Sequence, residues 1–339
     1  MSRDVALIGA AADDLRVGVD VGGTKVHAVL VAADGTVLGT CRRPTGLGPD
    51  ALVESVAGAV GQLCADADVA PAALAGVGVG VPGIVDPGGG RVAHAVNLGI
   101  TVPLALGPLL EARLGVPVTV ENDLNAAVLG AAQVLGLSGD LAFLALGTGL
   151  AAGLVLDGAL RRGVRGAAGE VGHVTYRPDG PVCRCGQRGC LELYASGTAL
   201  DAAWRARPGA PVGGPALAEA SPARPAPVEV FEAAGRGDRA AVAVRDSFAD
   251  AVAAAVRVLV LTVDVEHVVL GGGVAAIGGP LLEAVRGACD RYAEGSPFLT
   301  SLDISARIVV TPSDGLVAPR GAAVTVGTRA HEREPSWRS

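Results

Sequence analysis

The stretch RVGVDVGGTKVHAVLVAADGTVLGTCRRPT, residues 16–45, gives the clearest indication of the fold class of this chain. It opens with an apolar run that ends in an acidic residue and a glycine turn. Two β-rich runs follow, VHAVLV (26–31) and TVLGTC (36–41), and an Asp-Gly pair between them marks a tight turn. The spacing therefore predicts three consecutive short strands at the start of an α/β protein.

Outside this stretch, the chain alternates between apolar runs and helical patterns. Half of its 339 residues are hydrophobic, 50 are glycine and only 3% are aromatic, which is typical of α/β folds with buried parallel strands. A chain of this length exceeds one ordinary core, so we expect two domains. Helices are predicted over 50–67, 106–115, 124–136 and 239–262, and further strands over 74–83, 117–123, 141–149, 151–158 and 267–273.

Charge and hydropathy exclude several classes of protein. The net charge is −7 and the basic residues are scattered, so we expect no nucleic-acid partner. The longest apolar region, 249–273, is interrupted by Asp250, Arg257 and Asp264, which favours a helix followed by a strand over a membrane span. The apolar run near the N-terminus is barely long enough for a signal peptide. We therefore expect a cytoplasmic protein without a membrane partner.

Two other features are interpreted as structurally passive. Cys41, Cys64 and Cys289 stand alone, and in a reducing compartment we expect them to be small buried side chains. The Pro/Ala-rich stretch over 205–230 predicts a mobile surface insertion rather than a domain linker.

The segment DVGGTK (20–25) is a candidate phosphate cradle. Asp20 stands at a strand end, where it can lie near Mg²⁺ directly or through water. Gly22 and Gly23 can expose N–H groups to phosphate oxygens, Thr24 is a further donor, and Lys25 supplies a positive charge. The spacing differs from that of a Walker A motif. LALGTG and HVVLGGG are two further strand-to-glycine turns, and for the second a simple tight connection remains the alternative.

The segment VENDLNAA (120–127) supplies a candidate acid-base group. Asp123 lies where a strand turns into a helix, so one interpretation is a helix N-cap. The functional interpretation is that Asp123 takes the proton from a substrate hydroxyl during phosphoryl transfer while Asn122 orients that substrate. The later segment GAAGEVGH adds Glu170 and His173, which can also bind hydroxyls.

A cysteine cluster follows this histidine with the spacing H-x9-C-x-C-x4-C, formed by His173, Cys183, Cys185 and Cys190. Three cysteines and one histidine are a standard tetrahedral zinc set, and such closed sites leave no position for a catalytic water. A disulfide or a redox pair would leave the third thiol and the histidine unexplained, so the pattern favours structural Zn²⁺. The metal would hold the loop and its neighbours rigid.

These segments together resemble the ROK family of bacterial sugar kinases and related repressors. DVGGTK, GVGVPGIVDP, VENDLNAA, LGTG, GAAGEVGH, CRCGQRGCLE, ASGTAL and VVLGGGVA occur in the family's order over residues 17–275. The resemblance implies an actin-like ATPase (ribonuclease H-like) fold, with sugar and ATP bound in a cleft between two α/β domains. It implies a smaller domain over 1–122, a larger one over 123–314 with the zinc loop, and a C-terminal helix near 315–331 that packs back on the first domain.

The resemblance also implies a reaction and a role for each motif. The γ-phosphoryl group of ATP is transferred to a sugar hydroxyl, with glucose the commonest substrate for this motif set and Asp123 the catalytic base. His173 would place one ring nitrogen on zinc and turn the other toward the sugar. The residues implied in sugar binding are Gly83, Asn97, Asn122, Asp123, Glu170, His173 and Glu192. The turns implied in holding ATP are Asp20, Gly22, Gly23, Thr24 and Lys25 with Gly147, Thr148 and Gly149, while Gly272 and Gly273 border the nucleoside.

The sequence departs from the family pattern in two places. Ala151 stands where the family commonly has glycine after the second phosphate turn. In AHAVNLGITVPL, Val96 replaces a proline, Ile100 stands near a tryptophan position, and the loop is about one residue short. This loop lies beside the sugar pocket in the family, so N-acetylmannosamine, N-acetylglucosamine, fructose and a cyclitol remain alternative substrates.

Three rival functions are weighed against a kinase. A ROK repressor would carry a winged helix-turn-helix before the phosphate motif, yet only 19 residues precede Asp20. A sugar sensor without catalysis would be expected to lack Asp20 or Asp123, and both are present. Polyphosphate-dependent glucokinases typically lack the cysteine cluster, which favours ATP. The family also implies a homo-oligomer, either a dimer or a tetramer.

Overall fold

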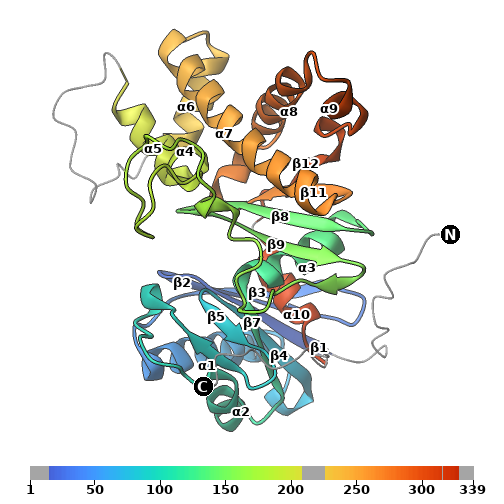
Figure 1. Ribbon diagram of the computed structural model, residues 1–339. Helices are drawn as coiled ribbons and strands as arrows, with labels where there is room; N and C mark the ends of the chain where they lie inside the picture. Colours follow the sequence, from blue (N-terminus) through green and yellow to red (C-terminus); the bar gives the residue numbers. More distant parts are fainter. Residues whose placement is uncertain (1–14, 208–225, 315, 328–339) are drawn as a thin grey trace. The chain divides into compact units, whose positions relative to one another are not determined.

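The structure is a computed structural model that describes residues 15–207, 226–314 and 316–327 (Figure 1). Contacts among its residues divide the chain into two compact units. Of the described residues, the first unit contains those up to Leu141, Gly153–Ala168 and those from Asp314 onward. The second contains Ala142–Ala152 and those of Gly169–Ser313.

The first unit is built on a five-stranded sheet with the order β3-β2-β1-β4-β7. The three strands predicted over 16–45 are present, and they pair antiparallel in sequence order. The later two strands pair parallel, β4 with β1 and β7 with β4. The bounds are β1 (Leu15–Val21), β2 (Lys25–Val31), β3 (Val37–Pro44), β4 (Leu74–Val81) and β7 (Val118–Asn122). A separate two-stranded sheet pairs β5 (Ile84–Asp86) with β6 (Arg91–Ala93).

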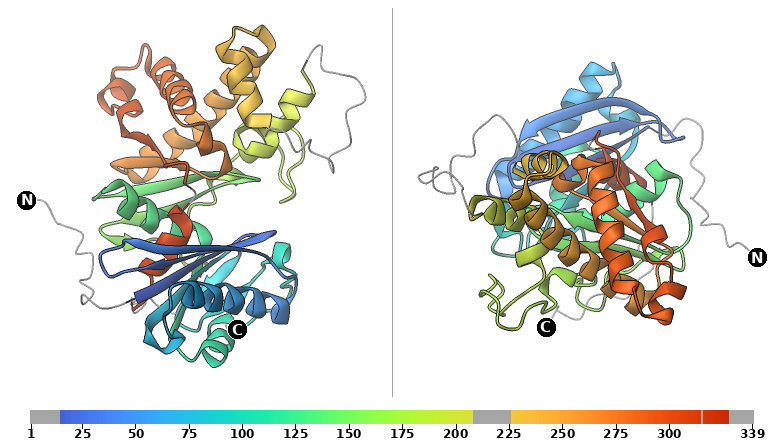
Figure 2. Two further views of the ribbon diagram at one scale, coloured as in Figure 1. Left: turned by 180° about the vertical axis from the view of Figure 1, so that it is seen from behind. Right: turned by 90° about the horizontal axis from the view of Figure 1, so that it is seen from above.

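Helices cover both faces of the first sheet (Figures 1 and 2). On one face, α1 (Pro49–Asp66) and α2 (Leu106–Leu114) close the hydrophobic core over the valines of β1 and β4. On the other face lie α3 (Asp123–Leu135) and α10 (Val317–Val324). Residues alternate between the faces of a strand, so Asp20 shares the α10 face of β1 with Gly18.

Glycines permit α3 and α10 to approach the sheet and each other closely. A Cβ on Gly18 of β1 would clash with the carbonyl oxygen of Pro319, and one on Gly78 of β4 would clash with that of Ala322. Between the helices, a Cβ on Gly130 would clash with the carbonyl oxygen of Val317. These contacts leave no room for a methyl group, which is the physical reason for glycine at these positions.

A second five-stranded sheet has the order β10-β9-β8-β11-β12. Its strands are β8 (Leu141–Leu146), β9 (Leu150–Leu156), β10 (Ala159–Leu160), β11 (His267–Gly271) and β12 (Ile308–Val310). Strand β10 pairs antiparallel with β9, and β12 pairs parallel with β11. The strands predicted over 141–149, 151–158 and 267–273 are therefore present, each shortened by the turn at its end.

The helices of the second unit include α7 and α8, which pack side by side (Figure 1). The bounds are α4 (Glu192–Ala195), α5 (Gly197–Arg205), α6 (Ala226–Gly235), α7 (Arg239–Val263), α8 (Gly279–Ala293) and α9 (Pro297–Ser301). Short 3₁₀ turns of the second unit are η3 (Val171–His173), η4 (Gly273–Ile277) and η5 (Ser305–Arg307), whereas η1 (Pro71–Ala73) and η2 (Val96–Leu98) belong to the first unit.

The apolar region over 249–273 divides as the sequence predicted. Helix α7 ends at Val263, Asp264 adopts a left-handed conformation with φ 50°, and β11 begins at His267. Within the described residues, no helix combines the length and apolar character needed to cross a membrane. Of the insertion predicted over 205–230, residues 208–225 lie outside the described residues, and 226–230 form the start of α6.

The compact units do not follow a division at residues 122 and 123. Helix α3, which begins at Asp123, groups with the first unit because it packs against α10 and lies over β4 and β7. Residues 153–168 also group with the first unit, although the chain passes through the second unit before reaching them.

The close helix contact predicts how stability responds to two glycine substitutions. Gly130→Ala adds a methyl group that would meet the Val317 carbonyl, so we expect it to lower the free energy of unfolding by about 1–3 kcal/mol. Gly61→Ala, in the exposed interior of α1, meets no atom within 4 Å and is expected to raise it by roughly 0.5–1 kcal/mol. Urea unfolding of both variants measures the effects, and equal effects would contradict this packing.

Candidate active site and metal-binding cluster

The turn between β1 and β2 is held by backbone and side-chain hydrogen bonds. The N–H of Gly22 donates to the carbonyl of Lys25 at 2.9 Å. From the end of β3, the Thr45 hydroxyl donates to the Gly22 carbonyl at 2.7 Å, and its N–H donates to the Thr24 carbonyl at 3.1 Å. These bonds fix the shape of the turn, as a site for phosphate oxygens requires.

Asn122 and Asp123 lie at the junction of β7 and α3. Asn122 is the N-cap of α3, and its side-chain oxygen accepts from the N–H groups of Leu124 at 2.9 Å and Asn125 at 3.2 Å. The alternative that Asp123 is the N-cap is therefore wrong. Asp123 is the first helical residue, and its Oδ1 accepts from the N–H of Leu124 at 3.0 Å. The helix N-terminus favours negative charge at this carboxylate.

The carboxylates of Asp20 and Asp123 influence each other. Burial and the negative charge of Asp123 raise the pKa of Asp20 to about 7, while Lys25 acts in the opposite direction. Two acidic groups in a partly buried site favour a bound proton or a cation. Carboxylate oxygens are ligands that Mg²⁺ accepts, and Mg²⁺ commonly keeps several waters. The donor set around Asp20 therefore fits a magnesium ion.

Gly83 and Asn97, the other residues of the first unit implied in sugar binding, lie near the β7–α3 junction and the turn between β1 and β2, respectively. The side-chain amide of Asn122 donates to the carbonyl of Gly83 at 3.1 Å. Gly83 has φ 106°, and a Cβ there would lie 2.6 Å from the carbonyl oxygen of Ala93. Asn97 lies beside the turn between β1 and β2, since a Cβ on Gly23 would be 3.7 Å from the Cβ of Asn97.

Sequence reasoning missed two residues of this region, Glu121 and Arg162. Glu121 is 2% exposed, and Arg162 donates to its carboxylate. A glutamate within the otherwise apolar run of β7 was a usable signal, because glutamate is rarely buried unless it is paired. Arg162 gave no such signal, since its partner is 41 residues away in the sequence.

In the second unit, the turns that follow β8 and β11 lie next to each other. Gly147 donates its N–H to the carbonyl of Gly149 at 3.1 Å, and Gly197 donates to the carbonyl of Gly147 at 2.7 Å. Gly272 has φ 81°, and a Cβ there would lie 2.7 Å from the carbonyl oxygen of Leu146. The structure thus brings the turn of Gly147, Thr148 and Gly149 beside Gly272 and Gly273. Ala151 lies within β9, after the turn.

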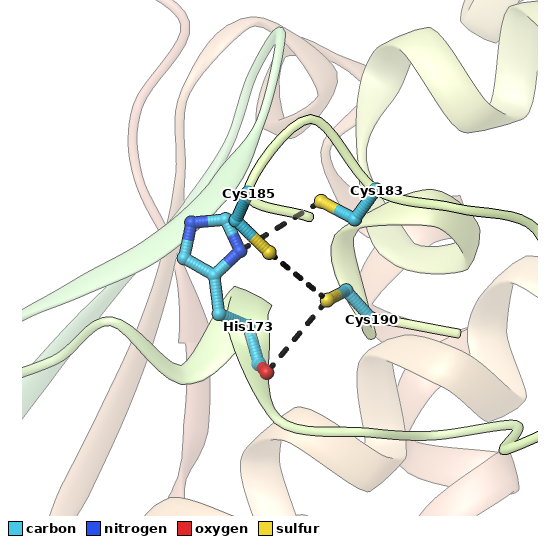
Figure 3. A group of neighbouring side chains, drawn as sticks. All are labelled: His173, Cys183, Cys185 and Cys190. Atoms are coloured by element: carbon cyan, nitrogen blue, oxygen red, sulfur yellow. Dashed lines mark hydrogen bonds between the residues drawn. The ribbon is translucent and has the colours of Figure 1, made fainter. Parts of the chain in front are cut away.

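The predicted metal ligands converge in the second unit (Figure 3). The ligand atoms of His173, Cys183, Cys185 and Cys190 all lie within 4.8 Å of one another. The Cys185 and Cys190 sulfurs are 3.6 Å apart, and the Cys183 sulfur is 3.9 Å from Nδ1 of His173. Tetrahedral zinc with Zn–S bonds near 2.3 Å places sulfurs about 3.8 Å apart. The cluster therefore fits one zinc ion.

Local backbone geometry shapes the loop around the cluster, and hydrogen bonds shift the pKa values of two of its thiols. Gly186 and Gly189 have φ values of 91° and 66°, which let the chain fold back around the cluster. The backbone N–H of Gln187 lowers the pKa of the Cys185 thiol to about 7. The Cys183 thiol donates to Oε1 of Glu192 at 2.9 Å, and this bond raises its pKa to about 12. Bound zinc would replace that proton, because thiolates are the zinc ligands.

The two ring nitrogens of His173 have different surroundings. Nδ1 faces the cluster and lies 3.8 Å from Oε1 of Glu192. Nε2 points away from the thiols in Figure 3 and lies 3.8 Å from Oε2 of Glu170. A metal on Nδ1 therefore leaves Nε2 and the carboxylate of Glu170 facing a common region.

Comparisons with known proteins agree with this fold. A family model described as ROK family matches residues 16–320, so the chain belongs to the ROK family. The glucokinase of Streptomyces coelicolor is 35% identical over 298 residues, covering 86% of this chain and 92% of that protein. An N-acetylmannosamine kinase of Escherichia fergusonii is 33% identical over 268 residues, covering 78% of this chain and 84% of that protein.

A solved structure extends the likeness to three dimensions. The crystal structure of a ROK family glucokinase from Streptomyces griseus, in complex with glucose and AMPPNP, matches with a TM-score of 0.72 and 32% identity. The match covers 91% of this chain and 98% of that one. The predicted actin-like ATPase fold, with two α/β domains, is confirmed by this likeness.

The metal cluster predicts a specific loss on substitution. We expect one zinc ion per chain in the purified protein, and Cys185→Ser removes one of four ligands, so it should lower zinc retention by at least about tenfold. Cys41→Ala, at a cysteine outside the cluster, should leave the zinc content unchanged. Metal analysis after competition with a chelator measures both. Wild-type protein without zinc would contradict the assignment.

The raised pKa of Asp20 predicts a pH dependence of stability in magnesium-free buffer. The folded protein keeps a proton on Asp20 up to about pH 7, whereas the unfolded chain loses it near the ordinary value of 3.8. The contribution of Asp20 to the free energy of unfolding is therefore greatest in acid and falls as the pH rises from about 4 to about 7. Asp20→Asn should be the more stable protein near pH 8.

Chemical unfolding of wild type and Asp20→Asn across this pH range tests the argument. The difference between the two proteins isolates the contribution of Asp20, because all other titrating groups are shared. Parallel stability curves for the two proteins would show that the carboxylate has an ordinary pKa.

Proposed function

We propose that this protein is an ATP-dependent glucokinase that transfers the γ-phosphoryl group of ATP to a glucose hydroxyl, giving glucose 6-phosphate. One observation carries the proposal: Asp123, at the start of α3, lies beside the end of β1, where the glycine turn of residues 22–24 begins. A Cβ on Gly80 would lie 3.5 Å from the Cα of Asp123 and 3.7 Å from the carbonyl oxygen of Val19, the residue before Asp20. The candidate base, Asp123, thus lies near the candidate phosphate-binding turn of residues 22–24. The glucokinases among its relatives support glucose as the substrate.

In the proposed mechanism, Asp123 accepts the proton of the sugar hydroxyl as that oxygen attacks the γ-phosphorus. The hydrogen bonds of Asn122 to the helix N-terminus and to Gly83 hold this junction in place. Asp20 would hold Mg²⁺, directly or through water, and the ion would neutralise charge on the phosphates. The N–H groups of the glycine turn, with Thr24 and Lys25, bind phosphate oxygens.

From the second unit, we assign Glu170, His173 and Glu192 to the sugar hydroxyls, together with Asn97 of the first unit. Zinc would fix the tautomer and direction of the His173 ring, because Nδ1 faces the thiols and Nε2 faces Glu170. The metal then takes no part in the reaction itself. The turns at Gly147, Thr148 and Gly149 and at Gly272 and Gly273 are assigned to ATP.

N-acetylmannosamine is the second candidate substrate. It is supported by the likeness to N-acetylmannosamine kinases. The loop around Asn97, which departs from the family pattern, is the part of the chain to which we would assign such a change of substrate. We also propose that the chain forms a homo-oligomer, as a dimer or a tetramer, on the family resemblance alone.

The proposal predicts activity on a defined panel of sugars. ADP release with ATP and Mg²⁺ is measured for glucose, mannose, fructose, both N-acetylhexosamines and several cyclitols. We expect the highest kcat/KM with glucose. Higher kcat/KM with N-acetylmannosamine would assign specificity to the altered loop, and no turnover on any sugar by zinc-loaded, folded protein would contradict the kinase assignment.

Asp123→Asn separates catalysis from binding. Because the substitution removes the base but keeps the shape of the side chain, we expect kcat to fall by about 10²–10⁴-fold while sugar binding changes little. Asp68→Asn, at an exposed aspartate after α1 with φ 54°, is the control and should keep wild-type kcat. Turnover near the wild-type rate in Asp123→Asn would exclude Asp123 as the base.

A further inference from the structure

Glu121 is a buried acidic residue next to the candidate active site. It is 2% exposed, and its place opposite Gly80 in the sheet puts it on the face covered by α3. There a Cβ on Gly80 would lie 3.3 Å from the Cβ of Ala126. An ionised carboxylate removed from water is costly unless its oxygens accept hydrogen bonds from several donors.

The structure supplies four such donors. Oε1 of Glu121 accepts from the backbone N–H of Asn122 and from the side-chain amide of Asn125, both at 2.9 Å. Oε2 accepts from Nε of Arg162 at 2.9 Å and from its Nη2 at 2.6 Å. The bonds from Arg162 are charge-assisted, and the guanidinium offers them in a fixed planar geometry.

These hydrogen bonds hold the chain on both sides of Asp123. One carboxylate oxygen binds the residue before Asp123 and also the residue two positions after it, so the chain on both sides is tied to Glu121. The backbone direction of Asp123 is thereby restricted, and the cap made by Asn122 restricts it further.

Arg162 also has an electrostatic effect. Glu121 is only two residues from Asp123, which is also a carboxylate. An unpaired negative charge on Glu121 would repel that of Asp123, whereas the guanidinium of Arg162 neutralises it. Arg162 lies in the loop after β10, where its carbonyl accepts from the N–H of Ala168 at 3.1 Å, so the loop itself is ordered around this arginine.

We propose that Glu121 and Arg162 are positioning residues for phosphoryl transfer: their largely buried ion pair holds the β7–α3 junction so that Asp123 presents its carboxylate to the sugar hydroxyl. The proposal rests on the proposed function, and it adds two residues to those assigned to the sugar and to ATP.

The experiment compares Arg162→Met and Arg162→Lys with a matched control. Arg113→Met removes another two-bond Arg–Glu pair of the same unit, in which Arg113 donates to Glu54 at 2.9 and 3.3 Å, but that pair is exposed. We expect Arg162→Met to lower kcat for the sugar on the order of 100-fold, because small displacements of a catalytic group have effects of this size. The KM for ATP should change by less than about threefold.

The conservative variant gives a second comparison. Arg162→Lys keeps the positive charge but cannot donate in a fork, so its kcat should lie between those of wild type and Arg162→Met. The control Arg113→Met should keep kcat within about twofold of wild type. A folded Arg162→Met variant with wild-type kcat would overturn the proposal, and so would a variant whose loss is entirely in the KM for ATP.

Hydrogen exchange provides a readout that is independent of activity. The amides of Leu124 and Asn125, which donate to the Asn122 cap, should exchange faster in Arg162→Met than in wild type, while amides within α1 keep their rates. Unchanged exchange at the junction would overturn the positioning role. If the wild-type protein phosphorylates no sugar, the proposed function fails, and the exchange result alone decides whether the pair holds the junction.

Discussion

The close packing of α3 and α10 on one face of the first sheet is the constraint on which the candidate active site depends. That contact is possible because Gly18, Gly78, Gly130 and Gly321 leave no Cβ in the way. Asp20 shares its strand face with Gly18, and Asp123 is the first residue of α3. The packing therefore brings the end of β1 and the start of α3 to the same side of the sheet, and a bulkier residue at these glycines would force them apart.

This arrangement collects negative charge. Asp20 lies at the end of β1, and Glu121 and Asp123 lie at the junction of β7 and α3. The negative charges of Glu121 and Asp20 are compensated in different ways. Glu121 is paired with Arg162 inside the protein, whereas Asp20 has only the partial effect of Lys25, so burial and Asp123 keep its pKa near 7. The guanidinium of Arg162 thus neutralises the carboxylate of Glu121. The carboxylate proposed for metal binding remains available to Mg²⁺, a cation that can arrive with ATP.

In the second unit, a cation would make the cysteine loop rigid. This loop has little regular structure. The path of the loop is set by backbone hydrogen bonds, by glycines with positive φ and by the four converging side chains of the cluster. Tyr176 and Tyr194 pack edge to face beside this loop, and the guanidinium of Arg177 lies over both rings. A metal on Nδ1 of His173 would join this loop to a side chain whose other nitrogen faces Glu170. The metal would thereby restrict the orientation of a candidate sugar-binding group.

Features that depend on local chemistry could be predicted from the order of the residues. The three strands over 16–45, the glycine turns and the convergence of His173 with three cysteines could be predicted, because their residue types and spacings are compatible with few other arrangements. Tertiary structure alone decided which distant groups meet: Glu121 with Arg162, Asn97 with the turn at Gly23, and α3 with α10 in the first unit rather than after a boundary at residue 122. It also made Asn122 rather than Asp123 the cap of α3. The physical reason is that such contacts depend on steric fit and on burial of charge across tens of residues, and neither leaves a periodic pattern in the chain.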